Sequence, residues 1–128
     1  MDTSGTLLEA LGMEFVSVER DRVVATMPVD ERTRQPYGYL HGGATAALLE
    51  TVASVGAVQN VDTAREIPLG VEICVQHRRS VREGLVTGTA EPLEMAPDRQ
   101  LWSVVARDDQ DRVISEGTCA IRVVARRD

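Results

Sequence analysis

The sequence predicts a single α+β domain, residues 1–128, in which one long helix packs against an antiparallel sheet. Residues 44–58 form an apolar segment of helical length that contains one charged residue, Glu50. Beyond residue 66 the chain changes character, because segments rich in β-branched residues follow one another with short turns between them. A length of 128 residues suits one domain with a buried core, and the chain contains no internal repeat.

The first half of the chain predicts a short helix, a hairpin and the long helix. Leucines recur on one face of residues 6–11, which indicates the short helix. Residues 13–18 and 22–27 predict two strands joined by a tight charged turn. Residues 29–39 show no period and predict a surface loop, and the long helix follows from about 43 to 58.

The second half predicts four strands, over residues 67–79, 85–93, 100–107 and 113–124. Parallel neighbours would need crossovers of a dozen or more residues, so these short connections favour antiparallel hairpins. The long helix is apolar nearly all round and therefore must be covered on more than one side. A strongly curved sheet, helped by a partner subunit, would cover it.

Composition excludes several kinds of partner. The net charge of −6 argues against binding to nucleic acid or to anionic membranes. Cys74 and Cys119 match no metal or redox spacing and predict buried free thiols in a reducing compartment. The two histidines also lack metal-ligand spacing, so we expect no metal and no cofactor. No signal peptide or membrane span is apparent, and a cytoplasmic protein is expected.

Glu50 is the first candidate for chemistry, because burying a carboxylate on an apolar helix is costly unless the group is paired. Ser54 lies one turn further on the same face. Ala46 and Ala47 lie one turn earlier, and their small side chains would leave space for a ligand. The alternative is that Glu50 lies at an exposed or interface edge of the helix, paired with an arginine.

The segment His41-Gly42-Gly43 precedes the helix and forms the second candidate. Glycine lets the backbone approach a ligand, and the unpaired N–H groups of a first helical turn carry positive partial charge. Such donors suit a carbonyl oxygen that becomes an oxyanion. A simple tight turn is the alternative, with His41 as a structural histidine that bonds a loop carbonyl. The Gln35 amide could donate to the same site, or it could be solvated.

A basic cluster at the end of a predicted strand is the third candidate. It contains His77, Arg78, Arg79, Ser80 and Arg82. Arginine matches phosphate with paired donors, so the cluster could bind a phosphate, and Arg99 of the next hairpin could join it. A solvated strand end is the alternative. The sequence has no nucleophile elbow and no P-loop.

Residues 35–43, followed by Glu50 and Ser54, resemble the hotdog-fold acyl-CoA thioesterases. The similarity is greatest to the branch of the phenylacetate-pathway, 4-hydroxybenzoyl-CoA and 1,4-dihydroxy-2-naphthoyl-CoA thioesterases. It extends over nearly the whole chain and includes residues 27–30, 70–73 and 77–84. A His-Gly-Gly turn with a helical Glu nine residues after the His is quite specific to this branch.

The resemblance implies a long helix wrapped by a curved antiparallel sheet, in a homotetramer built from two dimers. Its active sites lie at the dimer interface and take residues from two chains. Glu50 would be the nucleophile or general base, and the Gly42 N–H would polarise the thioester carbonyl. The remaining implied roles are orientation of the carbonyl and loop by Gln35 and His41, placement of water or carboxylate by Ser54, and coenzyme A contacts from Gly70, His77, Arg79, Ser80 and Arg99.

The expected function is therefore hydrolysis of an acyl-CoA thioester to the free acid and coenzyme A, with an aryl or hydroxyaryl acyl group favoured. A broad-range medium-chain acyl-CoA hydrolase is the first alternative. A non-catalytic acyl-CoA-binding module is the second, although a pure binder would gain nothing from burying Glu50.

Overall fold

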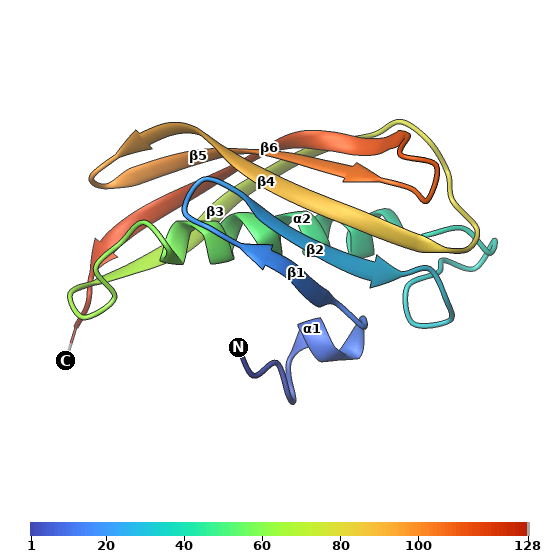
Figure 1. The fold of residues 1–128 in the computed structure, drawn as a ribbon, viewed down its shortest axis with the longest axis horizontal. Coiled ribbons are helices and arrows are strands. Elements are labelled where there is room, and N and C mark those ends of the chain that lie inside the picture. The colour runs from blue at the N-terminus through green and yellow to red at the C-terminus, as the bar shows by residue number, and fades with distance from the viewer. Residues whose placement is uncertain (128) are drawn as a thin grey trace.

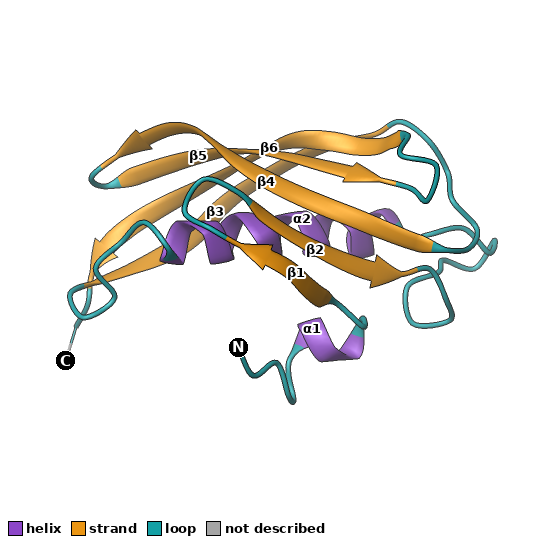
Figure 2. Ribbon diagram, in the orientation of Figure 1, coloured by secondary structure: helices purple, strands orange, loops and turns teal. Residues whose placement is uncertain are grey.

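The computed structural model describes residues 1–127, which form two helices and six strands (Figures 1 and 2). The elements in chain order are α1 (Leu7–Ala10), β1 (Glu14–Val18), β2 (Val23–Pro28), α2 (Gly42–Val58), β3 (Glu66–His77), β4 (Leu85–Ala96), β5 (Arg99–Arg107) and β6 (Val113–Ala125).

All six strands belong to one antiparallel sheet in the order β1-β2-β4-β5-β6-β3. The hairpins β1–β2, β4–β5 and β5–β6 confirm the prediction from the short turns. The expectation of a hairpin between β3 and β4 is wrong, because β3 pairs with β6 at the far edge of the sheet. The helix between β2 and β3 carries the chain across the sheet, and β4 then returns to pair with β2.

The curved sheet lies over α2 along most of the helix (Figure 1). Trp102 of β5 is fully buried beneath the helix, and its indole N–H donates to Gln100 Oε1 at 2.8 Å. A Cβ added to Gly56 would lie 2.6 Å from the indole ring, so the glycine lets α2 come down onto Trp102. Aliphatic side chains make up most of the remaining core, as the scarcity of aromatic residues requires.

The element boundaries differ from the predicted ones at places that matter for the site. Helix α2 begins at Gly42, one residue earlier than predicted, because His41 caps it by accepting the Gly43 N–H on Nδ1 at 2.8 Å. Strand β3 ends at His77, so Arg78 and Arg79 lie beyond the strand.

One face of α2 is left open by the sheet. Ala46, Ala47 and Ser54 are half-buried on this face. Glu50 is exposed, so the expectation of a buried carboxylate is wrong for the single chain, although no arginine pairs with it within residues 1–127. Among residues 1–127, no helix combines the length and hydropathy needed to cross a membrane.

The two cysteines have different environments, and the prediction of two buried thiols is wrong for Cys74. Cys74 pairs in register with Thr118, the neighbour of Cys119 on β6. Successive residues of a strand point to opposite faces of the sheet. Cys119 therefore faces the core and is buried, whereas Cys74 is exposed on the outer face.

Candidate active site

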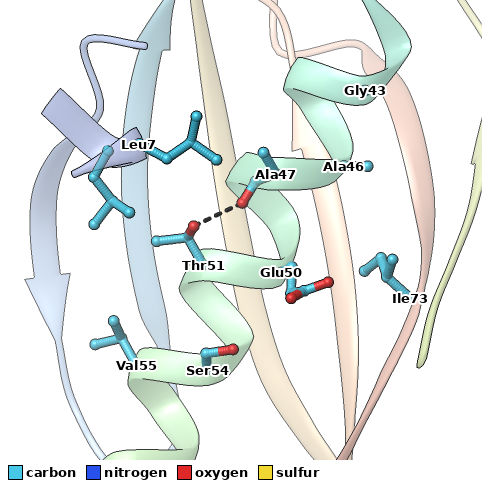
Figure 3. A pocket seen from close by; sticks show the side chains of 10 residues that line it. Leu7, Gly43, Ala46, Ala47, Glu50, Thr51, Ser54, Val55 and Ile73 are labelled. Carbon is cyan, nitrogen blue, oxygen red and sulfur yellow. Dashed lines mark hydrogen bonds between the residues drawn. The ribbon is translucent and has the colours of Figure 1, made fainter. Parts of the chain in front are cut away.

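A hollow of about 520 Å³ follows the open face of α2, between α1 on one side and β3 on the other (Figure 3). We call it the Glu50 hollow. Its lining is mostly apolar and consists of Leu7, Leu8, Gly43, Ala46, Ala47, Glu50, Thr51, Ser54, Val55 and Ile73. Leu7 and Leu8 were not predicted as site residues, although the leucine face of the first helix was visible in the sequence.

Glu50 and Ser54 are the polar groups of this hollow that remain available to a ligand. The Thr51 hydroxyl is occupied, because it donates to the Ala47 carbonyl at 2.7 Å (Figure 3). Within residues 1–127, neither the Glu50 carboxylate nor the Ser54 hydroxyl makes a hydrogen bond, and Glu50 forms no ion pair with an arginine. The side chain of Glu50 extends from the helix toward β3 (Figure 3).

A second, more polar hollow of about 290 Å³ lies at the N-terminus of α2. We call it the Gly42 hollow. It is lined by Gln35, Leu40, Gly42, Thr45, His77, Arg78, Arg79, Ser80, Val81, Ile114 and Ser115. The loop before α2, the end of β3 and the start of β6 therefore meet at the first turn of the helix.

The helix start presents one free amide to this hollow. The Gly43 N–H is taken by His41, whereas the Gly42 N–H has no partner among the described residues. His77 packs directly against Gly42, since an added Cβ would lie 2.8 Å from His77 Nε2. The other ring nitrogen, Nδ1, lies 2.7 Å from Ser115 Oγ. Ser115, which was not predicted, thereby fixes the orientation of the imidazole beside the helix terminus.

His41 and Gln35 are both held by local hydrogen bonds. His41 has a structural role, but it caps the helix by accepting an N–H and does not bond a loop carbonyl through its side chain. Gln35 Oε1 accepts the backbone N–H groups of Tyr37 and Tyr39. The half-buried Gln35 amide thus keeps its N–H donors for the Gly42 hollow.

The arginines of the basic cluster differ in their partners. Arg78 and Arg79 both line the Gly42 hollow, and Arg79 has no ion-pair partner within residues 1–127. Arg78 pairs with Glu116 at 3.4 Å. Arg82 donates to the Tyr39 hydroxyl at 2.8 Å and lies 4.4 Å from the centre of that ring. Arg79 is therefore the guanidinium best placed to meet an anion.

Two predicted coenzyme A contacts lie away from this cluster in a single chain. In the sheet, Arg99 of β5 lies opposite Arg122 of β6, and His77 of β3 lies opposite Ser115 of β6. The seven-residue separation along β6 places Arg99 about 23 Å from His77 in the strand direction. Gly70 lies next to Glu50 instead, because a Cβ added there would be 3.3 Å from Glu50 Oε2.

The two hollows are also separate in a single chain. Gly42 and Glu50 lie eight residues apart on α2, which corresponds to about 12 Å along the axis. A single carbonyl group cannot contact both the Gly42 N–H and the Glu50 carboxylate across that distance.

Among the described residues, no group of three or more His, Cys, Asp or Glu side chains gathers where it could hold a metal ion. Burial and, secondarily, the charge of Glu50 raise the pKa of Cys119 to about 11. The Cys119 thiol therefore remains neutral at physiological pH.

Comparison with known proteins gives consistent results. Residues 37–115 match the thioesterase superfamily. A 1,4-dihydroxy-2-naphthoyl-CoA hydrolase of Listeria monocytogenes is 38% identical over 94% of this chain and 98% of the relative. The proofreading thioesterase EntH of Cronobacter turicensis is 44% identical over 84% of this chain and 78% of its own length. The structure of thioesterase HI1161 from Haemophilus influenzae superposes with a TM-score of 0.91 at 33% identity, over 95% of this chain and 85% of that one.

Proposed function

This chain belongs to the thioesterase superfamily and is a thioester hydrolase with the hotdog fold, and we propose that it cleaves aryl- or hydroxyaryl-coenzyme A esters through Glu50. The observation that carries this proposal is the Glu50 carboxylate, which borders a largely apolar hollow and has no ion-pair partner within residues 1–127. We take residues 1–128 as one catalytic domain.

The reaction follows from the chemistry of the two hollows. The Glu50 carboxylate attacks the thioester carbonyl carbon, or removes a proton from the water that does so, and Ser54 lies one turn away to hold that water or the carboxylate. The Gly42 N–H and the Gln35 amide donate to the carbonyl oxygen as it gains negative charge. Collapse of the tetrahedral species expels coenzyme A as its thiolate. After direct attack, an anhydride between the acyl group and Glu50 remains, and water hydrolyses it to the free acid. After attack by water, the acid forms in the same step, and the proton taken up by Glu50 passes to the thiolate.

We propose that each site is completed by a second chain, because Gly42 and Glu50 are too far apart within one chain. Strand β3 supports this proposal, since it is a twelve-residue edge strand whose outer edge is free to pair. It also exposes apolar side chains, with Leu69 at 48% and Val71 at 61% of their accessible surface. A two-fold pairing of β3 edges would bring the Glu50 hollow of one chain toward the Gly42 hollow of the other.

Two such dimers would form the homotetramer that this branch of the family favours. Arg79 and Ser80 would bind the phosphates of coenzyme A, and Arg99 could reach the same coenzyme only from another chain. The free thiols and the acyl-CoA substrate fit a reducing, cytoplasmic compartment.

The acyl group would occupy the Glu50 hollow, whose apolar walls come from α1, α2 and β3. Ala46 and Ala47 leave width for a ring, which favours an aryl group, as does the relative named a 1,4-dihydroxy-2-naphthoyl-CoA hydrolase. The same walls would accept a medium-length alkyl chain, so a broad-range medium-chain hydrolase is the second candidate. A hydrolysis screen over aromatic, hydroxylated and aliphatic coenzyme A esters separates the two.

The test of the catalytic assignment is Glu50→Gln, which keeps the shape of the side chain and removes its charge. We expect kcat to fall on the order of 10²–10⁴-fold, while calorimetry shows that an acyl-CoA still binds. Glu91→Gln, a matched change at an exposed position of β4, should leave kcat unchanged. Full activity of Glu50→Gln would overturn the assignment, and loss of binding together with activity would indicate a purely structural role.

A further inference from the structure

The edge strand β3 contains a β-bulge beside the Glu50 hollow. Gly70 pairs with Ile121 and Glu72 pairs with Ala120, so Val71 is an extra residue without a partner on β6. Regular alternation would place residues 70 and 73, three positions apart, on opposite faces of the sheet. The bulge places both on the face that covers α2, where they pair across the strands with the buried residues Ile121 and Cys119.

Gly70 lies directly against the end of the Glu50 side chain. A Cβ at position 70 would be 3.3 Å from Glu50 Oε2, 3.6 Å from Cδ and 3.9 Å from Cγ. The first of these distances is tighter than an ordinary van der Waals contact, so a Cβ at position 70 would move the carboxylate by a few tenths of an ångström, and a larger side chain would move it further.

The backbone does not explain why residue 70 is glycine. Gly5, Gly12, Gly38 and Gly84 are the described glycines with positive φ, and Gly70 is not among them. Residues with side chains could therefore adopt its conformation, and glycine within a strand lowers stability by roughly 0.5–1 kcal/mol relative to alanine. A side chain at position 70 would instead take up part of the space that the Glu50 carboxylate occupies.

We propose that Gly70, held on the inner face by the bulge at Val71, is a positioning residue that sets the orientation of the Glu50 carboxylate and is not a coenzyme A contact. This inference rests on the proposed catalytic role of Glu50. No hydrogen bond within the described residues orients this exposed carboxylate, so the space left free at Gly70 is the constraint on how closely it approaches β3. The bulge and the missing side chain together leave that space.

The test is a graded series, Gly70→Ala and Gly70→Val, assayed for kcat and KM with an aryl-CoA ester. We expect kcat to fall a few-fold for alanine, whose Cβ requires a shift of a few tenths of an ångström. For valine we expect a fall of up to about 10²-fold, since a misplacement near 1 Å can cost that much. KM and the calorimetric affinity for coenzyme A should not change. Cys74→Ala, on the outer face of the same strand, is the control and should match the unchanged protein in every assay.

A second measurement separates positioning from a general structural effect. In a Glu50→Asp background the carboxylate is withdrawn by one methylene, so Gly70→Ala should lower kcat by less than twofold further. If Gly70→Ala lowered kcat by the same factor in both backgrounds, the proposal would be overturned. It would also be overturned by a higher KM with unchanged kcat, an unchanged kcat, or a loss of activity that accompanies dissociation in light scattering. Failure of the Glu50 assignment itself is recognised separately, by an active Glu50→Gln variant.

Discussion

The two hollows beside α2 hold their functional groups in different ways. In the Gly42 hollow, hydrogen bonds fix the groups: Gln35 bonds its own loop, and His77 bonds Ser115. In the Glu50 hollow the carboxylate is exposed, makes no hydrogen bond to any described residue and lies beside Gly70. The donors are thus preorganised by bonding, whereas the carboxylate is limited only by the space left for it at Gly70.

This difference suits the two halves of the proposed reaction. Donors that are already aligned stabilise a developing oxyanion without reorganising during the reaction. A carboxylate without hydrogen-bond partners keeps its lone pairs available for attack on carbon or for removing a proton from water. In the proposed mechanism each hollow supplies half of a site, so one site would take residues from two chains.

In the Gly42 hollow, the largest expected fall in kcat comes from Gly42→Ala. The new Cβ would lie 2.8 Å from His77 Nε2, so the helix start and the imidazole must move apart and the Gly42 N–H loses its alignment. Loss of one oxyanion donor lowers kcat by about 10²-fold or more. Steady-state kinetics check the fall in kcat, and thermal unfolding checks that the fold persists. Unchanged kcat would remove Gly42 from the oxyanion site.

A smaller effect, on binding alone, is expected from Arg79→Ala. Arg79 lines the Gly42 hollow and has no ion-pair partner in the described chain. A hydrogen bond to a charged group is worth about 1.5–3 kcal/mol. KM for coenzyme A esters should rise about tenfold or more, whereas KM for pantetheine esters, which lack the nucleotide phosphates, should not. Arg65→Ala, which removes an exposed arginine paired with Asp62 away from this hollow, is the control. Equal effects on both substrates would exclude a phosphate contact by Arg79.

The smallest expected effect is on kcat/KM and comes from Leu7→Ala in the Glu50 hollow. Leu7 is 57% exposed yet borders the hollow, so an acyl group would cover it on binding. Burying a whole leucine side chain is worth roughly 1.5–3 kcal/mol, and truncation to alanine removes part of it. We therefore expect kcat/KM to fall a few-fold for an aryl-CoA ester and to stay unchanged for acetyl-CoA. Leu93→Ala, at a leucine of β4 that is 56% exposed, is the matched control. Equal losses with acetyl-CoA would show that Leu7 does not contact the acyl group.

Local patterns were sufficient to predict most of the elements but not their arrangement. The apolar period predicted α2 to within one residue of its start, and short turns predicted three hairpins correctly. The pairing of β3 with β6 depends on contacts between segments far apart in the chain, which no local period encodes. That pairing is the reason Arg99 lies at the opposite end of the sheet from His77.

The same limit applies to the candidate site. Helical spacing placed Glu50 and Ser54 on one face, and helix-end chemistry identified the Gly42 amide, because both depend on neighbours in the chain. The contacts of Gly70 with Glu50 and of Ser115 with His77 depend on the bulge and on the register between strands. Alternation alone could not show the extra residue at Val71, and it therefore could not assign Gly70 to the carboxylate.

The most direct test of the two-chain site is complementation between Glu50→Gln and Gly42→Ala, each inactive alone. After the two proteins are unfolded, mixed in equal amounts and refolded, half of the dimers are mixed. In a two-fold dimer with shared sites, each mixed dimer has one site with both residues intact, so activity should return to about one quarter of the unmodified level. If Glu50 and Gly42 of the same chain served one site, no mixed dimer would contain an intact site. Activity that stays at the level of the separate variants would contradict the account.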